Sequence, residues 1–586
     1  MKQSANKIRI LNAGDSAFTI EFGNKISTNI NKRIRGFVLA LERAQTEGLF
    51  PSVTEWVPTF RSVTVYFTVS KTSHKKLRNR LLILAKTARS VDSGKKKVHH
   101  VPVCYDAAFA PDIENVSAHT GFSREKIIEL HTKNECLIYM LGFLPGFVYL
   151  GGMDARLATP RLASPRLKIE PGSVGIAESQ TGIYPLASPG GWQLIGKTPI
   201  KLYDPERTPP VLFKAGDYIK FDSISYNDYC ILSKNNKSSS DKSIKKTVKK
   251  TENFVTIIDA GALTTVQDIG RVGYQKDGFT VSGAMDVLSC RLANIIAGNA
   301  VDAAVLETTM IGPSLRFEQD TIFVITGANQ QPQLNGQSIP LYTQVYAQKA
   351  SVLTLSSCSL GLRTYIAFAG GIDVPKKLKS RSTSLRYKLG GYLGRKIEKN
   401  DILPLFSKNI KTVPRYPALP VPAKLYPIAF TDSKFKNSSV QILRVTEGPQ
   451  IDCLSKKELQ KLITNEYVIS GESDRMGLRL KGMAIKTLHG SDIISDAIAN
   501  GSVQIPSSGE PIIMAADRQT VGGYIKPVVV ITADIPKLGQ LQPGSKVRFS
   551  FVSVKTAVKL LKKQQICLNT YESLLKKNKK EDAKYE

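Results

Sequence analysis

A polar stretch near the middle of the chain, residues 234–250, constrains the fold more than any other feature. It consists mostly of lysine, serine and asparagine and contains no aromatic residue. Such a like-charged stretch cannot form a packed core and is typical of a solvated linker. We therefore predict a basic linker at residues 233–253 between two halves. Because a single core stops growing at roughly 250–300 residues, each half of this 586-residue chain should contain one or two folds.

The spacing of apolar residues predicts how each half is subdivided. Near the N-terminus, two segments with apolar residues at helical spacing flank a strand at residues 62–69. Beyond residue 98, short apolar runs separated by glycine and proline are typical of an all-β barrel. The fold class should therefore be mainly β with a small α/β N-terminal unit. The predicted domains are the α/β unit at 1–98, a β-barrel at 99–232, a first β domain of the second half at 254–435, a second β-barrel at 436–554 and a basic tail at 555–586.

A weak internal repeat links the two halves. Residues 172–176 (GSVGI) resemble residues 501–505 (GSVQI), and a Gly-Gly pair follows each segment. A turn that contains Gly216 or Gly544 then precedes a terminal strand in each half. Two copies of one barrel would produce this pattern, and chance agreement is the alternative.

The net charge of +32 suggests a nucleic-acid partner, but the distribution of lysine argues against one. Much of the lysine is concentrated in the linker and the tail, and the rest is spread without an aromatic-interleaved RNA-binding signature. We therefore expect no nucleic-acid partner. No run approaches the ~18 apolar residues that cross a bilayer, and the basic N-terminus lacks the apolar stretch of a secretory signal. These features predict a cytoplasmic protein with no membrane partner.

The seven cysteines and six histidines are scattered, with no C-x-x-C pair and no short ladder of metal ligands. We expect no disulfide framework and no metal site. Residues 191–198 match the P-loop pattern, but Pro199 follows at once and Ser188-Pro189-Gly190 precedes the match in place of a buried strand. Proline excludes a helix interior, so this segment should not bind phosphate as a P-loop does.

Polar, glycine-rich segments occur in both halves and combine arginine, aspartate and small residues that expose the backbone. Such a set suits a small planar molecule with a carboxylate or an amide. Aspartate–arginine neighbours can equally tie β-turns together, and for any single segment both interpretations stay open. Several such segments in one chain favour a shared site. They lie at residues 141–154, 159–166, 180–192, 265–274, 282–286, 472–477 and 516–524.

Between residues 8 and 550, these segments resemble in order the two halves of the allophanate hydrolase/carboxyltransferase family. The first half is similar to the family's subunit 1 and the second half to its subunit 2. The matching segments of the first half are residues 14–17, 61–62, 142–154, 159–161, 164–166 and 180–192. Those of the second half are residues 264–268, 282–286, 306–307, 369–373, 380–383, 473–477 and 517–520.

The resemblance implies cyclophilin-like β-barrels and three activities. The paired subunits serve as the B and C subunits of an ATP-dependent 5-oxoprolinase beside a separate A subunit. They also form the carboxyltransferase part of a biotin-dependent urea carboxylase, and a relative acts as a non-catalytic regulator of a histidine kinase. The only Met-Lys pair here is Met1-Lys2, so any biotin would have to be supplied by another chain.

The resemblance therefore favours a fused B/C component that opens 5-oxo-L-proline to L-glutamate with ATP and Mg²⁺, together with an A subunit. The two other activities remain alternatives, and homo-oligomerisation stays open. For orientation or proton transfer the matched segments offer Asp268, Asp286, Asp474 and Asp517. For substrate contacts they offer Arg161, Arg166, Gln180, Tyr184, Arg271, Ser282, Arg475, Arg518, Gln519 and Thr520. One departure is that the family's glycine-rich stretch after residues 380–383 is compressed here to residues 389–395.

Overall fold

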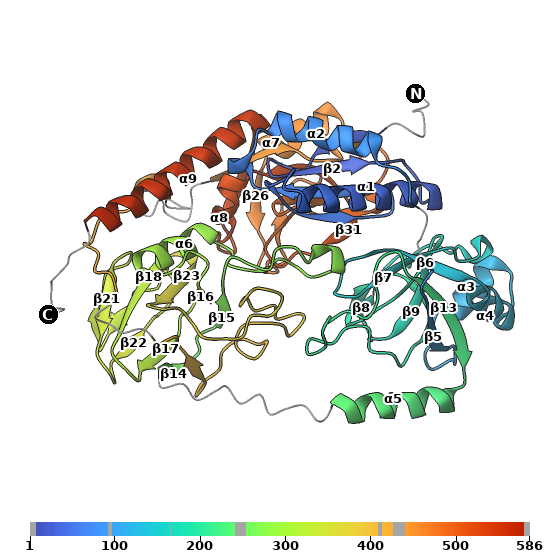
Figure 1. Cartoon of the computed structure of the whole chain (residues 1–586), viewed down its shortest axis with the longest axis horizontal. Helices are drawn as coiled ribbons and strands as arrows, with labels where there is room; N and C mark the ends of the chain where they lie inside the picture. Colours follow the sequence, from blue (N-terminus) through green and yellow to red (C-terminus); the bar gives the residue numbers. More distant parts are fainter. Residues whose placement is uncertain are drawn as a thin grey trace.

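The computed structural model describes residues 8–91, 96–164, 166–240, 253–407, 413–425 and 440–578. Figure 1 shows four units: an N-terminal α/β unit, a first barrel, a sheet unit at the start of the second half, and a second barrel beside the N-terminal unit. Strands account for more residues than helices, which confirms the mainly β prediction.

The N-terminal unit is a four-stranded antiparallel sheet covered by two helices. Its strands are β1 (Arg9–Asn12), β2 (Ala17–Glu21), β3 (Val53–Pro58) and β4 (Ser62–Phe67), in the order β1-β2-β4-β3. The helices are α1 (Thr28–Thr46) and α2 (His74–Thr87). In α1, Ile30, Ile34, Phe37 and Leu41 recur at helical spacing and are buried in the core of this unit.

The first barrel is a closed ring in which the first strand lies parallel to the last. Helices α3 (Ile113–Thr120) and α4 (Arg124–Lys133) contribute Ile113, Val116, Ile127 and Leu130 to its core. The Ser123 hydroxyl caps α4 by accepting a hydrogen bond from the Lys126 N–H. The ring strands are β5 (Val98–Cys104), β6 (Glu135–Leu141), β7 (Val148–Gly151), β9 (Ser173–Ala177), β10 (Gln180–Ile183), β12 (Gln193–Lys197) and β13 (Tyr218–Ile224). Strands β8 (Arg166–Ile169) and β11 (Ser188–Gly190) form a separate ribbon.

The second half begins with two sheets and helix α6 (Val287–Ile296), which packs on strands β18 and β23. The six-stranded sheet contains β14 (Phe254–Asp259), β17 (Ser314–Phe317), β19 (Gln333–Leu334), β20 (Gln337–Ser338), β22 (Val352–Thr354) and β24 (Ile402–Pro404). The five-stranded sheet contains β15 (Leu263–Gln267), β16 (Val305–Thr309), β18 (Thr321–Asn329), β21 (Gln344–Ala347) and β23 (Leu360–Phe368).

The second barrel repeats the topology of the first. Its ring strands are β25 (Gln441–Glu447), β26 (Glu466–Ile469), β27 (Gly477–Lys481), β29 (Ser502–Ile505), β30 (Ile512–Met514), β31 (Val521–Val530) and β32 (Lys546–Phe551). Strand β28 (Asp492–Ala497) pairs with β31, and helices α7 (Lys456–Thr464) and α8 (Ile535–Leu538) complete the unit.

Numbered by chain order within each barrel, with β28 left aside, both rings have the order 1-7-2-3-5-4-6. The two repeated pentapeptides overlap β9 and β29, the fourth strand of each ring. Gly216 and Gly544 both have positive φ, +94° and +85°, in the turn before the last strand. These correspondences support the interpretation of the sequence repeat as two copies of one barrel.

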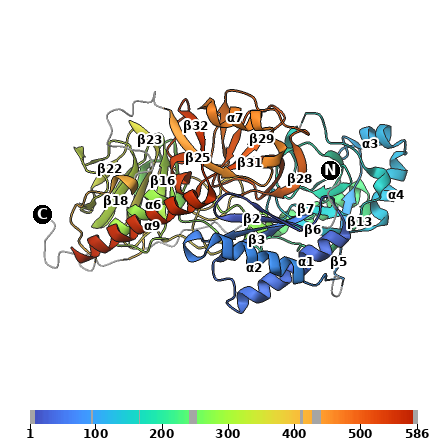
Figure 2. The same ribbon diagram turned by 90° about the horizontal axis from the view of Figure 1, so that it is seen from above.

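Two predicted boundaries differ from the structure. Helix α5 (Tyr226–Ser240) continues beyond the first barrel into the predicted linker, whose residues 241–252 lie outside the described residues. Helix α9 (Val554–Lys577) occupies most of the predicted tail, whose residues 579–586 lie outside the described residues. Figure 2 shows it running along the sheet unit, with one end beside the N-terminal unit. Its Val558 and Leu561 pack against the N-terminal unit, whereas Leu568 and Tyr571 are buried against α6. This helical apolar stripe, hidden among many lysines, explains why the segment folds. Along the described parts of the chain, none of the helices has the length and apolar character that crossing a bilayer requires.

Candidate functional site at the junction of the two halves

Side chains from all four units meet in one buried apolar cluster, which we call the junction. The outer face of the first barrel contributes an aromatic group in which the Phe147 ring lies edge-on to Tyr184 (5.0 Å between centroids) and Trp192 (5.6 Å). The other units contribute Val57 and Phe60 (N-terminal unit), Phe279, Tyr387 and Leu389 (sheet unit), and Ala497 and Val521 (second barrel). The two halves therefore share one core at this point.

Two glycines allow this close approach: Gly142 in the polar segment at residues 141–154, and Gly278, four residues after the segment at 265–274. A Cβ atom on Gly142 would lie 2.4 Å from Val521 Cγ2 of the second barrel. A Cβ on Gly278, which has φ +89°, would lie 2.2 Å from the Leu144 carbonyl oxygen of the first barrel. Both distances are far below van der Waals contact, so these positions require glycine if the halves are to pack as they do.

Of the predicted residues in the first half, Tyr184 and Arg161 lie on the side that faces the second barrel. Tyr184 is part of the junction, and Gln180 is buried with no hydrogen-bond partner at its Oε1 atom. Arg161 is exposed, and its Nη1 atom would lie 3.6 Å from a Cβ placed on Gly523 of the second barrel. Arg166 has a different role, since it donates to Asp112 Oδ1 at 2.6 Å and ties β8 to the first barrel.

Asp268 is enclosed by hydrogen-bond donors from the segment at residues 380–383. Its carboxylate accepts from the hydroxyls of Ser380 (2.8 Å) and Ser382 (2.5 Å) and from the backbone N–H groups of Arg381 (2.6 Å) and Gly270 (2.8 Å). A carboxylate with four donors has little capacity left for a ligand. In this structure Asp268 therefore shapes the site by anchoring that segment.

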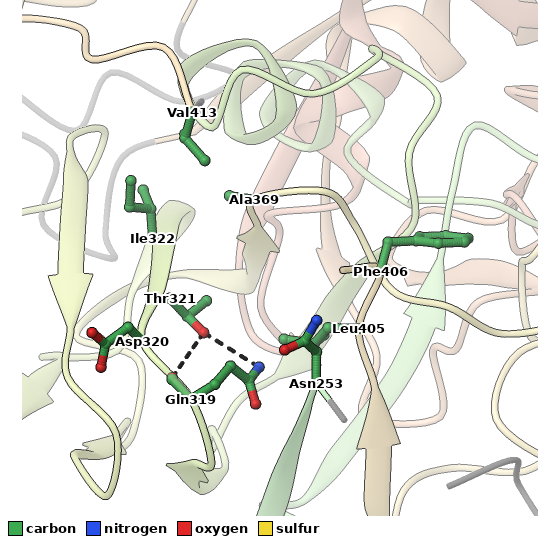
Figure 3. A pocket seen from close by; sticks show the side chains of 9 residues that line it. All are labelled: Asn253, Gln319, Asp320, Thr321, Ile322, Ala369, Leu405, Phe406 and Val413. Atoms are coloured by element: carbon green, nitrogen blue, oxygen red, sulfur yellow. Dashed lines mark hydrogen bonds between the residues drawn. The ribbon is translucent and has the colours of Figure 1, made fainter. Parts of the chain in front are cut away.

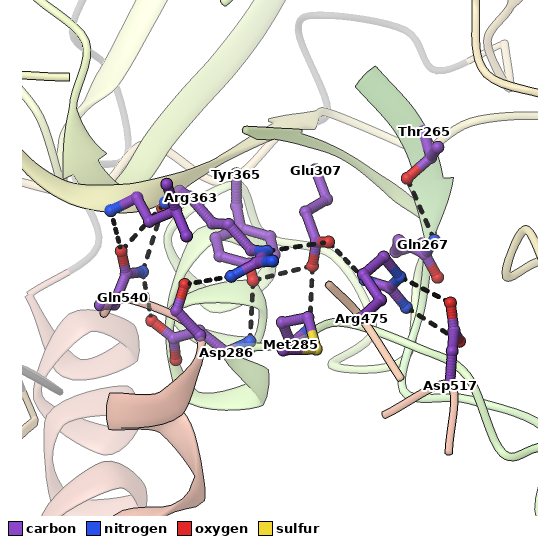
Figure 4. A network of polar contacts seen from close by, with 12 residues as sticks. Thr265, Gln267, Met285, Asp286, Glu307, Arg363, Tyr365, Arg475, Asp517 and Gln540 are labelled. Atoms are coloured by element: carbon purple, nitrogen blue, oxygen red, sulfur yellow. Dashed lines mark hydrogen bonds and ion pairs between the residues drawn. The ribbon is translucent and has the colours of Figure 1, made fainter. Parts of the chain in front are cut away.

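A buried ionic network, drawn in Figure 4, joins the sheet unit to the second barrel. Glu307 accepts from the Met285 N–H and the Tyr365 hydroxyl, both at 2.8 Å, and binds the Arg475 guanidinium through its other oxygen. Arg475 also donates from Nε to Asp517 Oδ2 at 2.8 Å. The Nε atom of Arg363 lies 3.7 Å from Glu307 Oε1. Because Glu307 and Arg363 come from the sheet unit and Arg475 and Asp517 from the second barrel, the network fixes one unit against the other.

Asp286 lies at the edge of this network and caps helix α6. Its side chain accepts from the Ser289 N–H (3.0 Å) and hydroxyl (2.5 Å) and from the Gln540 amide (2.8 Å). Burial raises the pKa of Asp286 to about 6, against the opposing effect of these hydrogen bonds. The geometry gives Asp286 a capping role.

The remaining predicted residues of the second half lie in turns around the junction. Asp474 accepts from the N–H groups of Met476 (2.8 Å) and Gly477 (3.2 Å), as an aspartate in a tight turn does. Arg518 donates to the Ile498 carbonyl (2.9 Å) and to the Gln275 side chain (3.0 Å). Ser282 has a φ of +54° and donates its N–H to the Ala516 carbonyl oxygen. Gln519 lies beside Gly522, and Thr520 is buried with an unpaired hydroxyl.

Arg271 differs from these anchored side chains. It is 1% exposed, and only its Nη2 atom has a hydrogen-bond partner, the Ser382 carbonyl oxygen. The Nε and Nη1 atoms have none. Burial lowers the pKa of Arg271, and the charge of Asp517 opposes that shift. This guanidinium therefore keeps donors available inside the junction.

Several residues of the site were missed from the sequence. Four of them lie outside the polar, glycine-rich segments: Tyr387 of the junction, and Arg363, Tyr365 and Gln540 of the network. The nearest signals were the matched segment at residues 306–307, which includes Glu307, and the segment at 380–383, which ends four residues before Tyr387.

Three further features bear on binding. Residues 191–198, which match the P-loop pattern, include strand β12, and no helix follows them directly, so they lack the loop-then-helix geometry with which a P-loop binds phosphate. Among the described residues, no three His, Cys, Asp or Glu side chains converge as metal ligands. A small cavity lies at the edge of the sheet unit, lined by residues such as Gln319, Thr321 and Phe406 (Figure 3). Its volume of about 30 Å³ has room for a water molecule and not for a substrate.

Comparison with known proteins agrees with this geometry. The family description "Carboxyltransferase domain, subdomain C and D" matches residues 8–213, and "Carboxyltransferase domain, subdomain A and B" matches residues 277–551. The first half is 42% identical over 234 residues to the B subunit of 5-oxoprolinase from Bacillus subtilis, covering 38% of this chain and 95% of the relative. The second half is 33% identical over 316 residues to the C subunit of 5-oxoprolinase from Haemophilus influenzae, covering 54% of this chain and 97% of the relative. The chain belongs to the carboxyltransferase-domain family.

Within this family, the protein joins a half that resembles the 5-oxoprolinase B subunit to a half that resembles the C subunit, as the sequence predicted. A solved structure, that of TTHA0988, superposes on 93% of this carboxyltransferase-domain protein and on 100% of its own chain, with a TM-score of 0.75 and 28% identity. The second half is also 31% identical over 326 residues to urea amidolyase of Saccharomyces cerevisiae, covering 53% of this chain but 17% of that enzyme. The arrangement of all four units is thus shared with a solved structure.

Proposed function

We propose that this protein is the fused B/C component of an ATP-dependent 5-oxoprolinase, which opens 5-oxo-L-proline to L-glutamate together with a separate A subunit. The observation that carries the proposal is the pair of near-full-length matches, one to the B subunit and one to the C subunit of that enzyme. The shared junction adds geometric support, because it brings the polar segments of both halves to one place.

The chemistry requires activation, because an unstrained lactam is a poor electrophile. ATP, with Mg²⁺, would supply a phosphoryl group that turns the lactam oxygen into part of a leaving group. The segment that matches the P-loop pattern is a barrel strand and does not suit a nucleotide. We therefore assign ATP binding to the complete complex. Biotin has no role here unless another chain supplies it.

This chain would bind and orient the substrate at the junction. Arg271 retains unpaired donors there, and Arg161 lies at the rim between the two barrels. The Asp517 side chain, 15% exposed, binds Arg475 and lies close enough to Arg271 for their charges to interact. In this position Asp517 can accept a proton from an attacking water, whereas Asp268 and Asp286 are held by other hydrogen bonds.

The second candidate function is carboxyl transfer, favoured by the similarity of the second half to a urea amidolyase. It needs a biotinylated partner, whereas the 5-oxoprolinase reaction needs an A subunit. The discriminating experiment measures glutamate release from 5-oxo-L-proline and ATP with this chain alone, with an A subunit alone, and with the two mixed. We expect turnover only in the mixture. Absence of turnover there, together with carboxylation of urea in the presence of a carboxybiotinylated carrier, would support the second candidate.

A further inference from the structure

The unpaired donors of Arg271 lie beside a second unpaired polar group. The Tyr387 hydroxyl is buried without a hydrogen-bond partner, and its ring belongs to the junction. Burial raises the pKa of Tyr387, while the charges of Arg386 and Arg271 oppose that shift. The Arg271 side chain reaches the same turn, since a Cβ placed on Gly390 would lie 2.9 Å from its Nη2 atom. Tyr203 of the first barrel fixes the backbone here by donating to the Tyr387 carbonyl oxygen at 3.1 Å. Buried polar groups rarely lack partners, so an ordered water or a bound ligand is expected to complete these hydrogen bonds.

Arg386 connects this cluster to the surface. Its guanidinium is half-buried, stacks over the Phe143 ring at 5.6 Å and makes only a soft contact, 3.4 Å, with the Met476 sulfur. Phe143 itself has a positive φ of +66°, an uncommon conformation for a large side chain. The adjacent Leu385 and Lys388 are exposed. Arg386 therefore stands between solvent and the buried Tyr387 and Arg271.

We propose that Arg271 and Tyr387 form a subsite for the carboxylate of a small substrate, with Arg386 at its entrance. The subsite lies where the first barrel (Tyr203), the sheet unit (Arg271, Tyr387) and the second barrel (Asp517) meet. It therefore exists only when the two halves are assembled. The identity of the substrate as 5-oxo-L-proline rests on the proposed function; the carboxylate subsite rests on the geometry alone.

The surroundings favour a carboxylate over a phosphate. Asp517 and Asp268 both act electrostatically on Arg271, so an incoming anion meets two negative charges as well as the guanidinium. A carboxylate carries one charge and a phosphate up to two, so the phosphate suffers the greater repulsion. Because Arg271 is 1% exposed, entry of any ligand requires the segment around Tyr387 to move aside.

The test is equilibrium binding by calorimetry with three probes: 5-oxo-L-proline, 2-pyrrolidinone, which is the same lactam without its carboxylate, and inorganic phosphate. We expect the protein to bind 5-oxo-L-proline at least tenfold more tightly than 2-pyrrolidinone. Arg271→Gln should weaken binding of 5-oxo-L-proline by about 10- to 100-fold, as loss of a charge-assisted hydrogen bond does, and leave 2-pyrrolidinone unchanged. Tyr387→Phe should act in the same direction with a smaller effect and no loss of folding.

Tyr467→Phe is the matched control, because Tyr467 is also buried with an unpaired hydroxyl but lies in the core of the second barrel. It should leave all three affinities unchanged. Equal affinities of the wild type and Arg271→Gln for 5-oxo-L-proline would overturn the proposal, as would phosphate binding that depends on Arg271 more strongly than carboxylate binding does. If 5-oxo-L-proline fails to bind while acetate or L-proline binds through Arg271, the subsite stands and the proposed function fails. If no carboxylate binds through Arg271, only water occupies the position and the subsite is refuted.

Discussion

At the scale of single residues, His131 shows how strongly the first barrel controls a charge. Its ring nitrogens lie 2.7 Å from the Tyr105 hydroxyl and 2.9 Å from the Thr181 hydroxyl, and its ring stacks on Phe221. Burial lowers the pKa of His131 to about 3. In the folded barrel the His131 imidazole therefore stays neutral as the pH falls through about 6.5. In the unfolded chain the same imidazole binds a proton at that pH.

This difference predicts that acid destabilises the first barrel. A group whose pKa is lowered by folding binds more protons in the unfolded state, so the free energy of unfolding should fall as the pH drops below ~6.5. Between pH 7.5 and pH 5.5 the loss due to His131 should be about 1.4 kcal/mol. Denaturant unfolding followed by Trp192 fluorescence, in a Trp56→Phe background, measures it. The control is His131→Gln, which should lack this part of the pH dependence; an equal slope in both proteins would contradict the assignment.

The ionic network makes a second prediction at this scale. Glu307→Gln keeps the shape of the side chain but leaves Arg475 paired with Asp517 alone and removes the charge 3.7 Å from Arg363. Uncompensated buried charge costs about 3–5 kcal/mol, so the midpoint of thermal unfolding should fall by several degrees. Differential scanning calorimetry measures the change, with Glu472→Gln, a side chain 74% exposed, as control. Equal midpoints for both variants would show that the network adds no stability.

At the scale of elements, the loop after β6 meets the start of β31. Gly142 has a φ that any residue can adopt, and only the Val521 side chain prevents a larger residue. Gly142→Ala should therefore destabilise the protein by about 1–3 kcal/mol through overpacking. The double variant Gly142→Ala, Val521→Ala should recover part of this loss, because the second change removes the methyl groups in the way. Thermal midpoints of the four proteins in this cycle test the contact, and strict additivity would contradict it.

Sequence patterns predicted the elements better than their partners. Local spacing sufficed for the strands, because a strand depends on neighbours along the chain, and the repeated pentapeptides sufficed to predict two copies of one barrel. It did not show that Asp268 is held by Ser380 and Ser382, over a hundred residues away, or that Arg166 bonds to Asp112. Aspartate and arginine in a ligand site look the same in sequence as those in a structural ion pair. Only the fold distinguishes Arg271, which has unpaired nitrogens, from Arg475, in which every guanidinium nitrogen has an acceptor.

At the scale of the whole molecule, the two halves are bound by more than the connection between them. The N-terminal unit bonds to the second barrel through Asp15 and Thr532 (2.6 Å) and through Ser62 and Asp496 (2.6 Å). It bonds to the sheet unit through Glu55, which accepts from the Gly273 N–H at 3.0 Å. Helix α9 packs on both the N-terminal unit and the sheet unit, and the junction adds a shared apolar core.

Cutting the chain should therefore leave one particle. A protease site placed within residues 241–252 and cleaved after purification should give two fragments that co-elute in gel filtration at micromolar concentration and keep their activity. A second variant with Gly142→Ala in the cleaved protein should dissociate more readily, because it weakens the junction. Separation of the fragments after cleavage alone would mean that the interface depends on the covalent link.

The central claim is that the two halves build one substrate site at their junction. A crystal structure of the protein with 5-oxo-L-proline tests it most directly. The account predicts ligand density at the junction, with the carboxylate within hydrogen-bond distance of Arg271 and Tyr387 and the ring close to Asp517. Well-defined density confined to one half, away from these three residues, would contradict it.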